Sequence, residues 1–344
     1  MSLSRPVKFP LLKLPFLCIE CVIKSWDILD IIFFTVFSKK TRQIVKHLKI
    51  TLNRIEIILS DLIYIRLDSS LKKWYFSDES ERESFFDKHR NSRKYPLMLQ
   101  KNAIHLYTVK TDVSLESYST ENKLIALKMA MEFLKEVFKC SVEAVNIDAD
   151  NFPESGNIGV RSTTNLLITK QGSQSLGHAQ SQKLSLLLEN LKVTGICTIM
   201  RNTENGFYVD PKLFKCKTLF FWPGSAAWVT RDILLQFEVP QLQFYYCPFS
   251  VEDILSFVTD WFHSDDKKLE YLFILIQDNQ ITLENFQKEE LNLVPFSERN
   301  RVPSSEYFRD IDFSKGLEIV RHDGLSASIH VKGKALLFYV WHNQ

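Results

Sequence analysis

The chain has 344 residues, of which 45% are hydrophobic and 24% charged, and its net charge at neutral pH is +2. These values exclude wholesale disorder and the strongly basic surface of a typical nucleic-acid-binding domain, and the length allows one large domain or two smaller ones. With 10 glycines and no glycine-rich nucleotide-binding sequence, a phosphate-binding loop is disfavoured.

The first residues are apolar but do not predict a targeting or membrane segment. We expect residues 1–8 to form an N-terminal tail. Lys13, Glu20 and Lys24 interrupt the apolar run that follows, which makes it a poor signal peptide. The apolar stretch 28–37 is too short to span a bilayer, and the chain contains no N-glycosylation sequon. We therefore expect an intracellular protein, cytoplasmic or nuclear, with no membrane partner.

Three short helices are predicted within residues 9–50. Pro15, Asp27 and Ser38 are each suited to the start of a helix. The first and third helices carry an apolar stripe, whereas the second is apolar nearly all round. Such small helices bury little surface on their own, so the second helix requires cover from another domain, a partner, or both.

Residues 14–41 resemble the F-box along their whole length without a gap. The matching positions are Leu14-Pro15, Val22-Ile23, Trp26, Asp30-Ile31, Phe37 and Ser38-Lys39-Lys40. Two departures stand out. Thr41 replaces the usual tryptophan, which weakens core packing in the generic motif, and Phe16-Leu17 replace the usual acidic pair. The amino-acid sequences of residues 10–15, 23–32 and 38–41 resemble those of the large nematode expansion of F-box proteins.

This resemblance implies a module that docks on a Skp adaptor. The residues that we expect to face or support the adaptor are Leu14, Pro15, Ile19, Val22, Ile23, Trp26, Ile31, Phe34 and Phe37. Ile19 and Phe34 are included because of the apolar stripe more than the motif. Periodicity alone would favour a different interpretation, in which these residues form the core of a helical subdomain.

A β-rich region is predicted over residues 51–122. Residues 54–68 are rich in β-branched side chains and predict one or two strands, and residues 104–109 predict another. The charged stretch 77–94 indicates a solvated loop or an exposed helix, and the serine-rich stretch 112–120 indicates a surface loop.

Residues 123–292 alternate between helical and strand patterns. A helix is predicted over 123–138, and later strands begin at intervals of roughly 25 to 28 residues, which is within the range of solenoid repeats. The polar stretch 171–182 is expected to be a surface loop. The simplest arrangement is an open, curved, leucine-rich-repeat-like α/β layer, although the strict leucine and asparagine ladder is absent.

Residues 293–344 predict antiparallel strands with turns at 322–324 and 332–334. The whole chain is thus expected to be α+β: a small three-helix F-box (9–50), followed by an open α/β leucine-rich-repeat-like layer that ends in antiparallel strands. Residues 244–274 and 321–341 resemble the F-box-associated domain, type 2, and we assign 51–344 to it. This second resemblance implies a target-binding domain without chemistry of its own.

No catalytic constellation or cofactor site is predicted. Strand alternation would put the carboxylates of Asp148 and Asp150 on one face at a strand end, but a solvated strand end is the simpler explanation for them. His178 lies in a polar loop and is expected to be exposed, and His322 and His330, which flank a predicted hairpin turn, are too few for a metal site. The six cysteines, Cys18, Cys21, Cys140, Cys197, Cys216 and Cys247, lie in apolar surroundings typical of reduced thiols.

The resemblance therefore predicts a non-enzymatic substrate-recognition subunit of a Skp–cullin–F-box (SCF) ubiquitin ligase. Its partners would be a Skp adaptor, a cullin reached through that adaptor, and a target protein, with no small-molecule substrate. One alternative is an adaptor-independent interaction scaffold that uses the α/β layer alone. A nucleic-acid-binding protein is a weaker alternative, because basic residues at helical spacing in 38–49 are typical of a solvated helix face.

Overall fold

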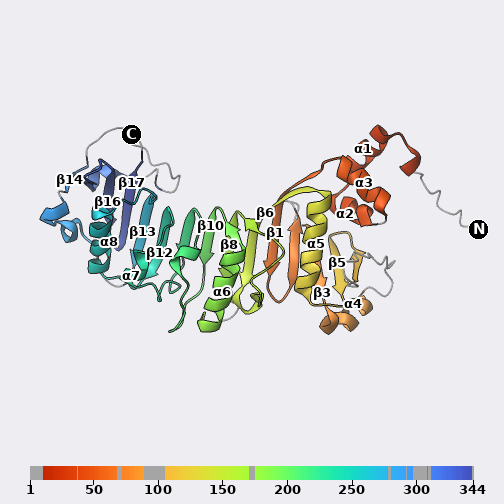
Figure 1. The fold of residues 1–344 in the computed structure, drawn as a ribbon, viewed down its shortest axis with the longest axis horizontal. Coiled ribbons are helices and arrows are strands. Elements are labelled where there is room, and N and C mark those ends of the chain that lie inside the picture. The colour runs from red at the N-terminus through yellow and green to blue at the C-terminus, as the bar shows by residue number, and fades with distance from the viewer. Residues whose placement is uncertain are drawn as a thin grey trace, which may run out of the picture. The chain divides into compact units, whose positions relative to one another are not determined.

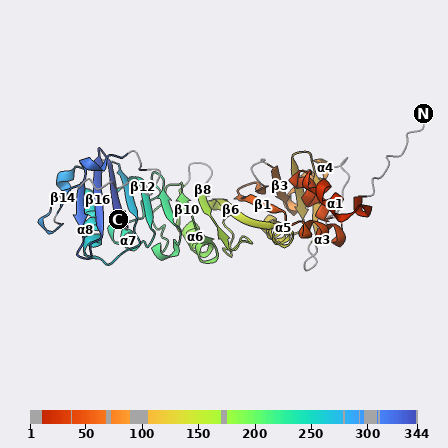
Figure 2. The ribbon, with the colours of Figure 1, turned by 90° about the horizontal axis from the view of Figure 1, so that it is seen from above.

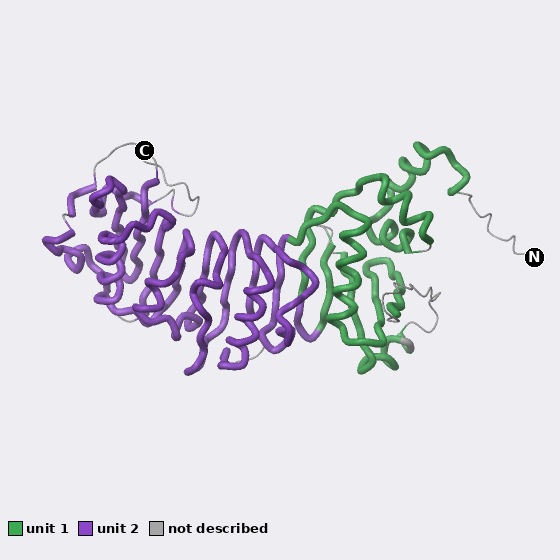
Figure 3. The backbone as a smooth tube through the Cα atoms, in the orientation of Figure 1, with its two compact units in different colours: residues 1–58, 62–142 green, residues 59–61, 143–344 purple. Residues whose placement is uncertain are grey.

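The structure is a computed structural model that describes residues 11–36, 38–67, 72–88, 105–169, 175–277, 280–291, 293–296, 308 and 311–342. It divides into two compact units (Figure 3): unit 1 comprises residues 1–58 and 62–142, and unit 2 comprises 59–61 and 143–344. Each unit combines helices with a mixed sheet, which confirms the predicted α+β class. The predicted tail 1–8 and Phe37 lie outside the described residues. Among the helices described, none has the length and apolarity to cross a membrane.

Unit 1 begins with the three short helices that the sequence predicts (Figure 1). A 3-10 turn, η1 (Leu11–Lys13), precedes α1 (Phe16–Lys24), α2 (Ile28–Val36) and α3 (Lys39–His47). Pro15 lies at the start of α1, and the Leu29 N–H donates to Asp27 Oδ1 at 2.9 Å at the start of α2. Two of the predicted helix starts are therefore fixed by local backbone chemistry.

The third start, at Ser38, is a reciprocal capping box. The Thr41 N–H donates to Ser38 Oγ and the Ser38 N–H donates to Thr41 Oγ1, both at 3.1 Å. Thr41 is 3% exposed, so its hydroxyl takes part in this box inside the helical module. The residue that departs from the F-box pattern thus fixes the beginning of α3 by hydrogen bonding.

The rest of unit 1 is a five-stranded sheet with a long helix on one face. The strands are β1 (Thr51–Leu59), β2 (Ile63–Leu67), β3 (Lys72–Ser77), β4 (Leu106–Lys110) and β5 (Ser114–Ser119), in the order β1-β2-β3-β5-β4. Helix α5 (Lys123–Val137) contacts β2, β3 and β5. On the other face, the turn η2 (Glu79–Glu81) and α4 (Arg82–Lys88) bring Phe85 against Val109 and Tyr118.

The prediction of a surface loop over the serine-rich stretch 112–120 is wrong, because this stretch forms strand β5. Ser114, Ser117 and Ser119 are at most 5% exposed. The hydroxyl of Ser117 accepts a hydrogen bond from Trp74 Nε1 at 2.7 Å and pairs with the hydroxyl of Thr108. A buried hydroxyl is tolerated where it has such partners, so serines can occupy an inner strand.

Unit 2 starts with six parallel strands whose order in the sheet is their order in the chain. They are β6 (Lys139–Asp148), β8 (Asn165–Thr169), β10 (Ile196–Ile199), β11 (Thr218–Phe221), β12 (Gln241–Cys247) and β13 (Tyr271–Ile276). No strand was predicted at β8. A separate short pair, β7 (Ser162–Thr163) and β9 (Lys192–Val193), lies outside this sheet.

The antiparallel end of the sheet follows the prediction. After β13 the order continues through β17 (Ala335–Trp341), β16 (Ser326–Lys332), β15 (Leu317–Val320) and β14 (Val294–Pro295). The predicted turns contain Gly324 and Gly333, whose φ angles are +84° and +62°. Glycine adopts this left-handed backbone without the steric cost of a side chain, which explains both turns.

The helices of unit 2 are α6 (His178–Asn190), α7 (Arg231–Leu234) and α8 (Val251–His263). Short 3-10 turns lie between strands: η3 (Ala149–Asn151), η4 (Pro211–Leu213), η5 (Leu283–Phe286), η6 (Glu289–Leu291) and η8 (Phe313–Lys315). Helix α6 begins inside the stretch 171–182 that was predicted to be a loop. Its first turn is polar because it faces solvent, and the Gly177 N–H donates to Gln180 Oε1 at 3.1 Å.

The three helices that the structure describes in unit 2 lie on the same side of its parallel strands (Figure 2). Crossover connections between parallel strands are right-handed, so strands added in one direction bring every crossover to one face. On this covered face Val145, Leu166, Cys197, Leu219, Leu242 and Leu272 are at most 1% exposed. The opposite face, which we call the open face, carries both buried polar side chains, such as Gln241 and Gln243, and half-buried ones, such as Leu167, Thr198, Phe220, Tyr245 and Phe273.

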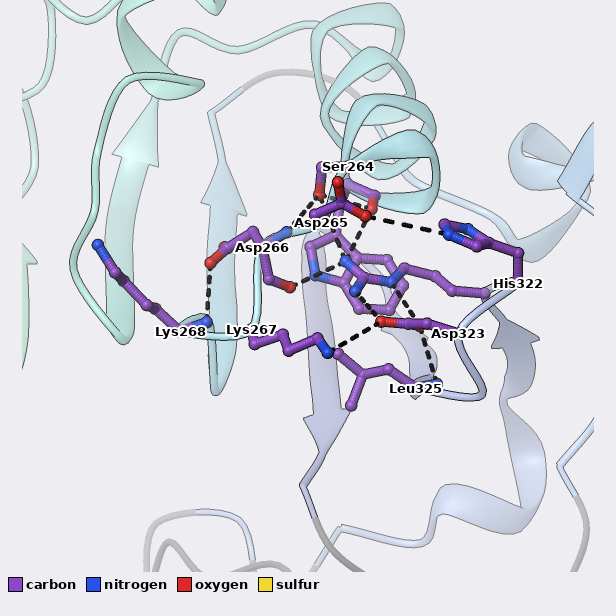
Figure 4. A network of polar contacts seen from close by, with 10 residues as sticks. Ser264, Asp265, Asp266, Lys267, Lys268, His322, Asp323 and Leu325 are labelled. Carbon is purple, nitrogen blue, oxygen red and sulfur yellow. Dashed lines mark hydrogen bonds and ion pairs between the residues drawn. The ribbon is translucent and has the colours of Figure 1, made fainter.

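A network of polar contacts ties the end of α8 to the turn between β15 and β16, and Figure 4 labels Ser264, Asp266 and Asp323 within it. Arg321 is 2% exposed, and its guanidinium donates to Asp323 at 2.6 and 3.1 Å and to the Asp266 carbonyl at 2.8 Å. It also lies 5.0 Å from the ring centre of Trp261. The hydrogen bonds from Arg321 hold the pKa of Asp323 well below its usual range. Paired in this way, a buried guanidinium does not carry an uncompensated charge.

We expect Asp323→Asn to lower the unfolding midpoint at pH 7, because Arg321 would keep its buried charge without a carboxylate. A carboxyl with a lowered pKa stabilises the folded state above the unfolded pKa of about 4 and loses that contribution as the pH falls. The midpoint difference between wild type and variant should therefore narrow below about pH 4. Asp265→Asn, at a side chain that is 93% exposed, is the control. A difference that stays constant from pH 7 to about pH 3 would contradict this assignment.

Candidate functional site

Helix α1 has apolar side chains on both its buried side and its exposed side. Ile19 and Ile23 are 5% and 0% exposed and belong to the core. On the outer side, Phe16 is 48% exposed and Leu17 is 73% exposed, and Leu12 in the preceding turn is 40% exposed. Pro15, Cys18 and Cys21 are exposed as well. We call Leu12, Pro15, Phe16 and Leu17 the α1 surface.

The structure distributes the predicted adaptor-site residues over three environments. Pro15 is exposed, and Leu14, Val22, Trp26 and Phe34 are half-buried. Ile19, Ile23 and Ile31 are at most 5% exposed, so they can support a surface but not form it. The rings of Trp26 and Phe34 meet edge to face at 5.2 Å, which joins the end of α1 to α2. Phe37 lies outside the described residues.

Helix α2, which the sequence predicts to need cover, finds that cover within unit 1. Leu29, Ile31 and Ile32 are at most 5% exposed. Around this apolar contact, Asp27 lies 3.4 Å from Lys72 and Asp30 lies 3.0 Å from Lys110. Ion pairs this exposed contribute little stability, so burial of the apolar side chains is the main contribution.

Helix α3 connects the helical module to α5. The guanidinium of Arg42 lies 5.1 Å from the ring centre of Phe133 and 3.8 Å from a carboxylate oxygen of Glu136. Lys39, Lys40 and Lys46 are exposed. Arg42 therefore packs between helices, whereas the three lysines form a solvated helix face, as predicted for the basic residues of 38–49.

Part of the α1 surface was not predicted from the sequence. Leu12 was not singled out, and Phe16 and Leu17 were noted only as departures from the F-box pattern. A signal did exist, because two large apolar residues directly after Pro15 occupy the first turn of a helix whose inward stripe begins only at Ile19. Adjoining exposed apolar residues make the α1 surface a candidate interaction site.

The carboxylates and imidazoles considered in the sequence do not come together. Asp148 is 4% exposed, and its Oδ1 accepts the Asp150 N–H at 3.0 Å, which caps the 3-10 turn η3. Asp150 is exposed, so the two carboxylates do not share one face as strand alternation predicted. His178 is the first residue of α6, whereas a loop was predicted there. Within the described ranges, no three His, Cys, Asp or Glu residues gather as a metal site would require.

Comparison with known proteins gives little support for a particular family. No family model matches the chain. One curated protein, an uncharacterized protein of Caenorhabditis elegans, is 32% identical over 128 residues. The alignment covers 34% of this chain and 29% of that protein, so the chain spans less than a third of the relative that it matches. No solved structure matches.

The cysteines offer a direct test of the α1 surface. Burial raises the pKa of Cys197 well above its usual value, that of Cys216 to about 12 and that of Cys247 to about 11. Cys18 and Cys21 are exposed on α1. We expect iodoacetamide at pH 8 to modify Cys18 and Cys21 first and these three buried thiols only after unfolding, as read by peptide mass spectrometry. Modification of Cys197 as fast as Cys18 would contradict the described packing.

Proposed function

We propose that this protein is a substrate-recognition subunit of an SCF-type ubiquitin ligase, in which the α1 surface docks on a Skp adaptor and unit 2 binds the target. The observation that carries the proposal is the combination of an F-box-like sequence over 14–41 with large apolar side chains exposed at the start of α1. The family would be the nematode F-box proteins with a type 2 F-box-associated domain.

The packing of the helical module supports a docking role for its outer side. Ile19 and Ile23 are the buried side chains of α1, whereas Phe16 and Leu17 stay 48% and 73% exposed, so we expect their replacement to affect binding more than folding. Full burial of a Phe or Leu side chain stabilises a complex by about 1.5–3 kcal/mol. Two such residues beside the half-buried Leu14, Val22 and Trp26 would make the compact apolar centre that protein interfaces contain.

The proposal assigns positioning, and no bond chemistry, to this chain. The adaptor would connect it to a cullin, and a separate subunit would bring the charged ubiquitin carrier. Holding a target lysine near that carrier accelerates transfer by raising the effective concentration of the reactants. The successive parallel strands of unit 2, with helices on one face, support the leucine-rich-repeat-like layer expected for the target-binding part.

We expect the double variant Phe16→Asp, Leu17→Asp to lose Skp adaptor binding by at least tenfold, because it places two charges in the proposed apolar contact. The assay is co-expression of the full chain with a Skp adaptor, followed by size-exclusion chromatography and titration calorimetry. Val113→Asp is a matched control, since Val113 is an exposed apolar residue of unit 1, 69% exposed, outside the helical module. Leu14→Ala with Pro15→Ala should also abolish binding.

Two results would separate this proposal from its alternatives. Adaptor binding should protect Cys18 and Cys21 from iodoacetamide while Cys140 stays as reactive as in the free chain. A soluble chain that forms no complex with the adaptor, or one whose complex tolerates both aspartates, would refute the docking surface. The adaptor-independent scaffold would then be the better description.

A further inference from the structure

A cavity of about 650 Å³ lies in unit 2 beside the last turns of α8, and we call it the α8 cavity. Helix α7 has four residues and α8 has thirteen. Beyond the end of α7, the irregular residues 235–238 line the cavity together with the end of α8. Volumes of about 300–1,000 Å³ are typical of ligand sites, so this cavity is large enough for a bound group.

The buried part of the cavity lining is apolar and is held in place by its neighbours. Four apolar lining residues are at most 7% exposed: Leu242, Phe257, Trp261 and Leu269. The ring of Trp261 packs edge to face on Phe338 at 4.9 Å, and the Arg321 guanidinium lies 5.0 Å from its centre. Leu235, which also lines the cavity, is 39% exposed. A large apolar side chain of a ligand would leave water here and contact preformed walls.

The indole N–H of Trp261 is a buried donor without an acceptor. Trp261 is 4% exposed, and its Nε1 has no hydrogen-bond partner among the described residues. Nearly all buried donors in native proteins are paired, so an unpaired one points to water or a ligand as its partner. Since Trp261 lines the α8 cavity, a carbonyl oxygen of a ligand bound there can accept this hydrogen bond.

The exposed lining residues form an acidic rim. Four of them are carboxylates and two are amines: Glu238, Asp260, Asp265, Asp266, Lys267 and Lys268. Both amines already have carboxylate partners, since Lys268 Nζ lies 2.7 Å from Glu238, and Lys267 Nζ lies 3.9 Å from Asp323 (Figure 4). The rim therefore keeps an excess of negative charge.

Three aspartates account for this excess. Asp260 has no ion pair in the described part of the chain, and the ionic neighbour of Asp265 there is the His322 imidazole, 4.0 Å away. Asp266 accepts the Lys268 N–H at 2.7 Å, which leaves its negative charge in place. Like charges repel, so the rim disfavours a phosphate or a nucleic acid and attracts a cationic group.

We propose that the α8 cavity is a docking site for a basic segment of a partner protein, in which one large apolar side chain lies between two arginines or lysines. The apolar side chain would contact Phe257 and Trp261, and a main-chain carbonyl of the segment would accept from Trp261 Nε1. The flanking cations would pair with Asp260 and Asp265. The charge of the rim selects the sign of the segment, and the buried lining selects the apolar residue. This inference rests on the proposed function in one respect: the partner would be the ligase target.

The test measures the fluorescence anisotropy of fluorescein-labelled nonapeptides with the full chain, in about 50 mM salt, where screening is weak. The probe is built from Ser and Gly with Arg-Phe-Arg at its centre. One matched peptide has Glu-Phe-Glu there, and another has Arg-Ser-Arg. We expect the probe to bind more tightly than both matched peptides by about tenfold or more.

The charged contact is tested by Asp260→Asn with Asp265→Asn, which should weaken probe binding by about tenfold or more. The matched control is Glu154→Gln with Asp232→Asn. These are carboxylates of unit 2 outside the cavity lining, with side chains 85% and 78% exposed. The control variant should bind the probe as the wild type does.

The apolar contact is tested by Leu235→Ser, which should also weaken the probe by about tenfold. Its matched control is Leu186→Ser, since Leu186 on α6 is likewise 39% exposed and lies outside the cavity lining. Each variant is checked by near-ultraviolet circular dichroism and by Skp adaptor binding through the α1 surface. Failure of adaptor binding alone would refute the proposed function and leave the peptide result standing.

The docking site is supported if the probe binds selectively and the cavity variants lose it while they keep their fold. It is overturned if the probe does not bind at concentrations up to about 1 mM, or if the Glu-Phe-Glu peptide binds as tightly. Displacement of the probe by an equal concentration of phenethylamine would also overturn it, because a small cation would then be the occupant. Dimers in sedimentation that Leu235→Ser abolishes would overturn it in favour of a second copy of this chain.

Discussion

The handedness of the crossover connections is the constraint from which the rest of unit 2 follows. Six parallel strands are added in chain order and in one direction, so right-handed crossovers bring α6, α7 and α8 to the same face. Parallel sheets are usually covered on both faces. Here the covered face is fully buried and contains both aliphatic side chains and the stacked rings of Phe221 and Phe244, whereas the open face keeps half-buried side chains such as Phe220 and Tyr245. The two faces therefore differ in burial because the topology gives them different neighbours.

In unit 1 the three short helices pack against the rest of the unit, since they cannot form a stable core alone. The apolar side chains of α2 are buried within this unit, with Asp27 and Asp30 paired to lysines of the β-rich region, and α3 joins α5 through Arg42. The helical module is thus part of a larger core. In this arrangement the buried contact of α1 is made by Ile19 and Ile23, while Phe16 and Leu17 in its first turn stay 48% and 73% exposed.

Local signals in the sequence were sufficient for part of this structure and insufficient elsewhere. Helix starts at Pro15, Asp27 and Ser38 and the glycine turns depend on neighbouring residues only, and these predictions are confirmed. Strand β5 was mistaken for a loop because the hydrogen-bond partners of Ser117 are distant in the sequence and are brought to it by the fold. These partners are Trp74 and Thr108. The start of α6 was missed because a polar first helical turn has the composition of a loop. Which face of α1 is exposed, and which face of the sheet lacks helices, likewise depends on tertiary packing.

The short strand β14 has a consequence for how unit 2 can meet other proteins. In the described part of the chain it is the last strand at its edge of the sheet, and it is only two residues long, Val294 and Pro295. Proline has no N–H to offer a neighbouring strand, and so short an edge is a poor template for strand addition. A polypeptide would gain few main-chain hydrogen bonds there. So short an edge with a proline also gives another sheet little to pair with, which protects this end of the sheet from edge-to-edge aggregation.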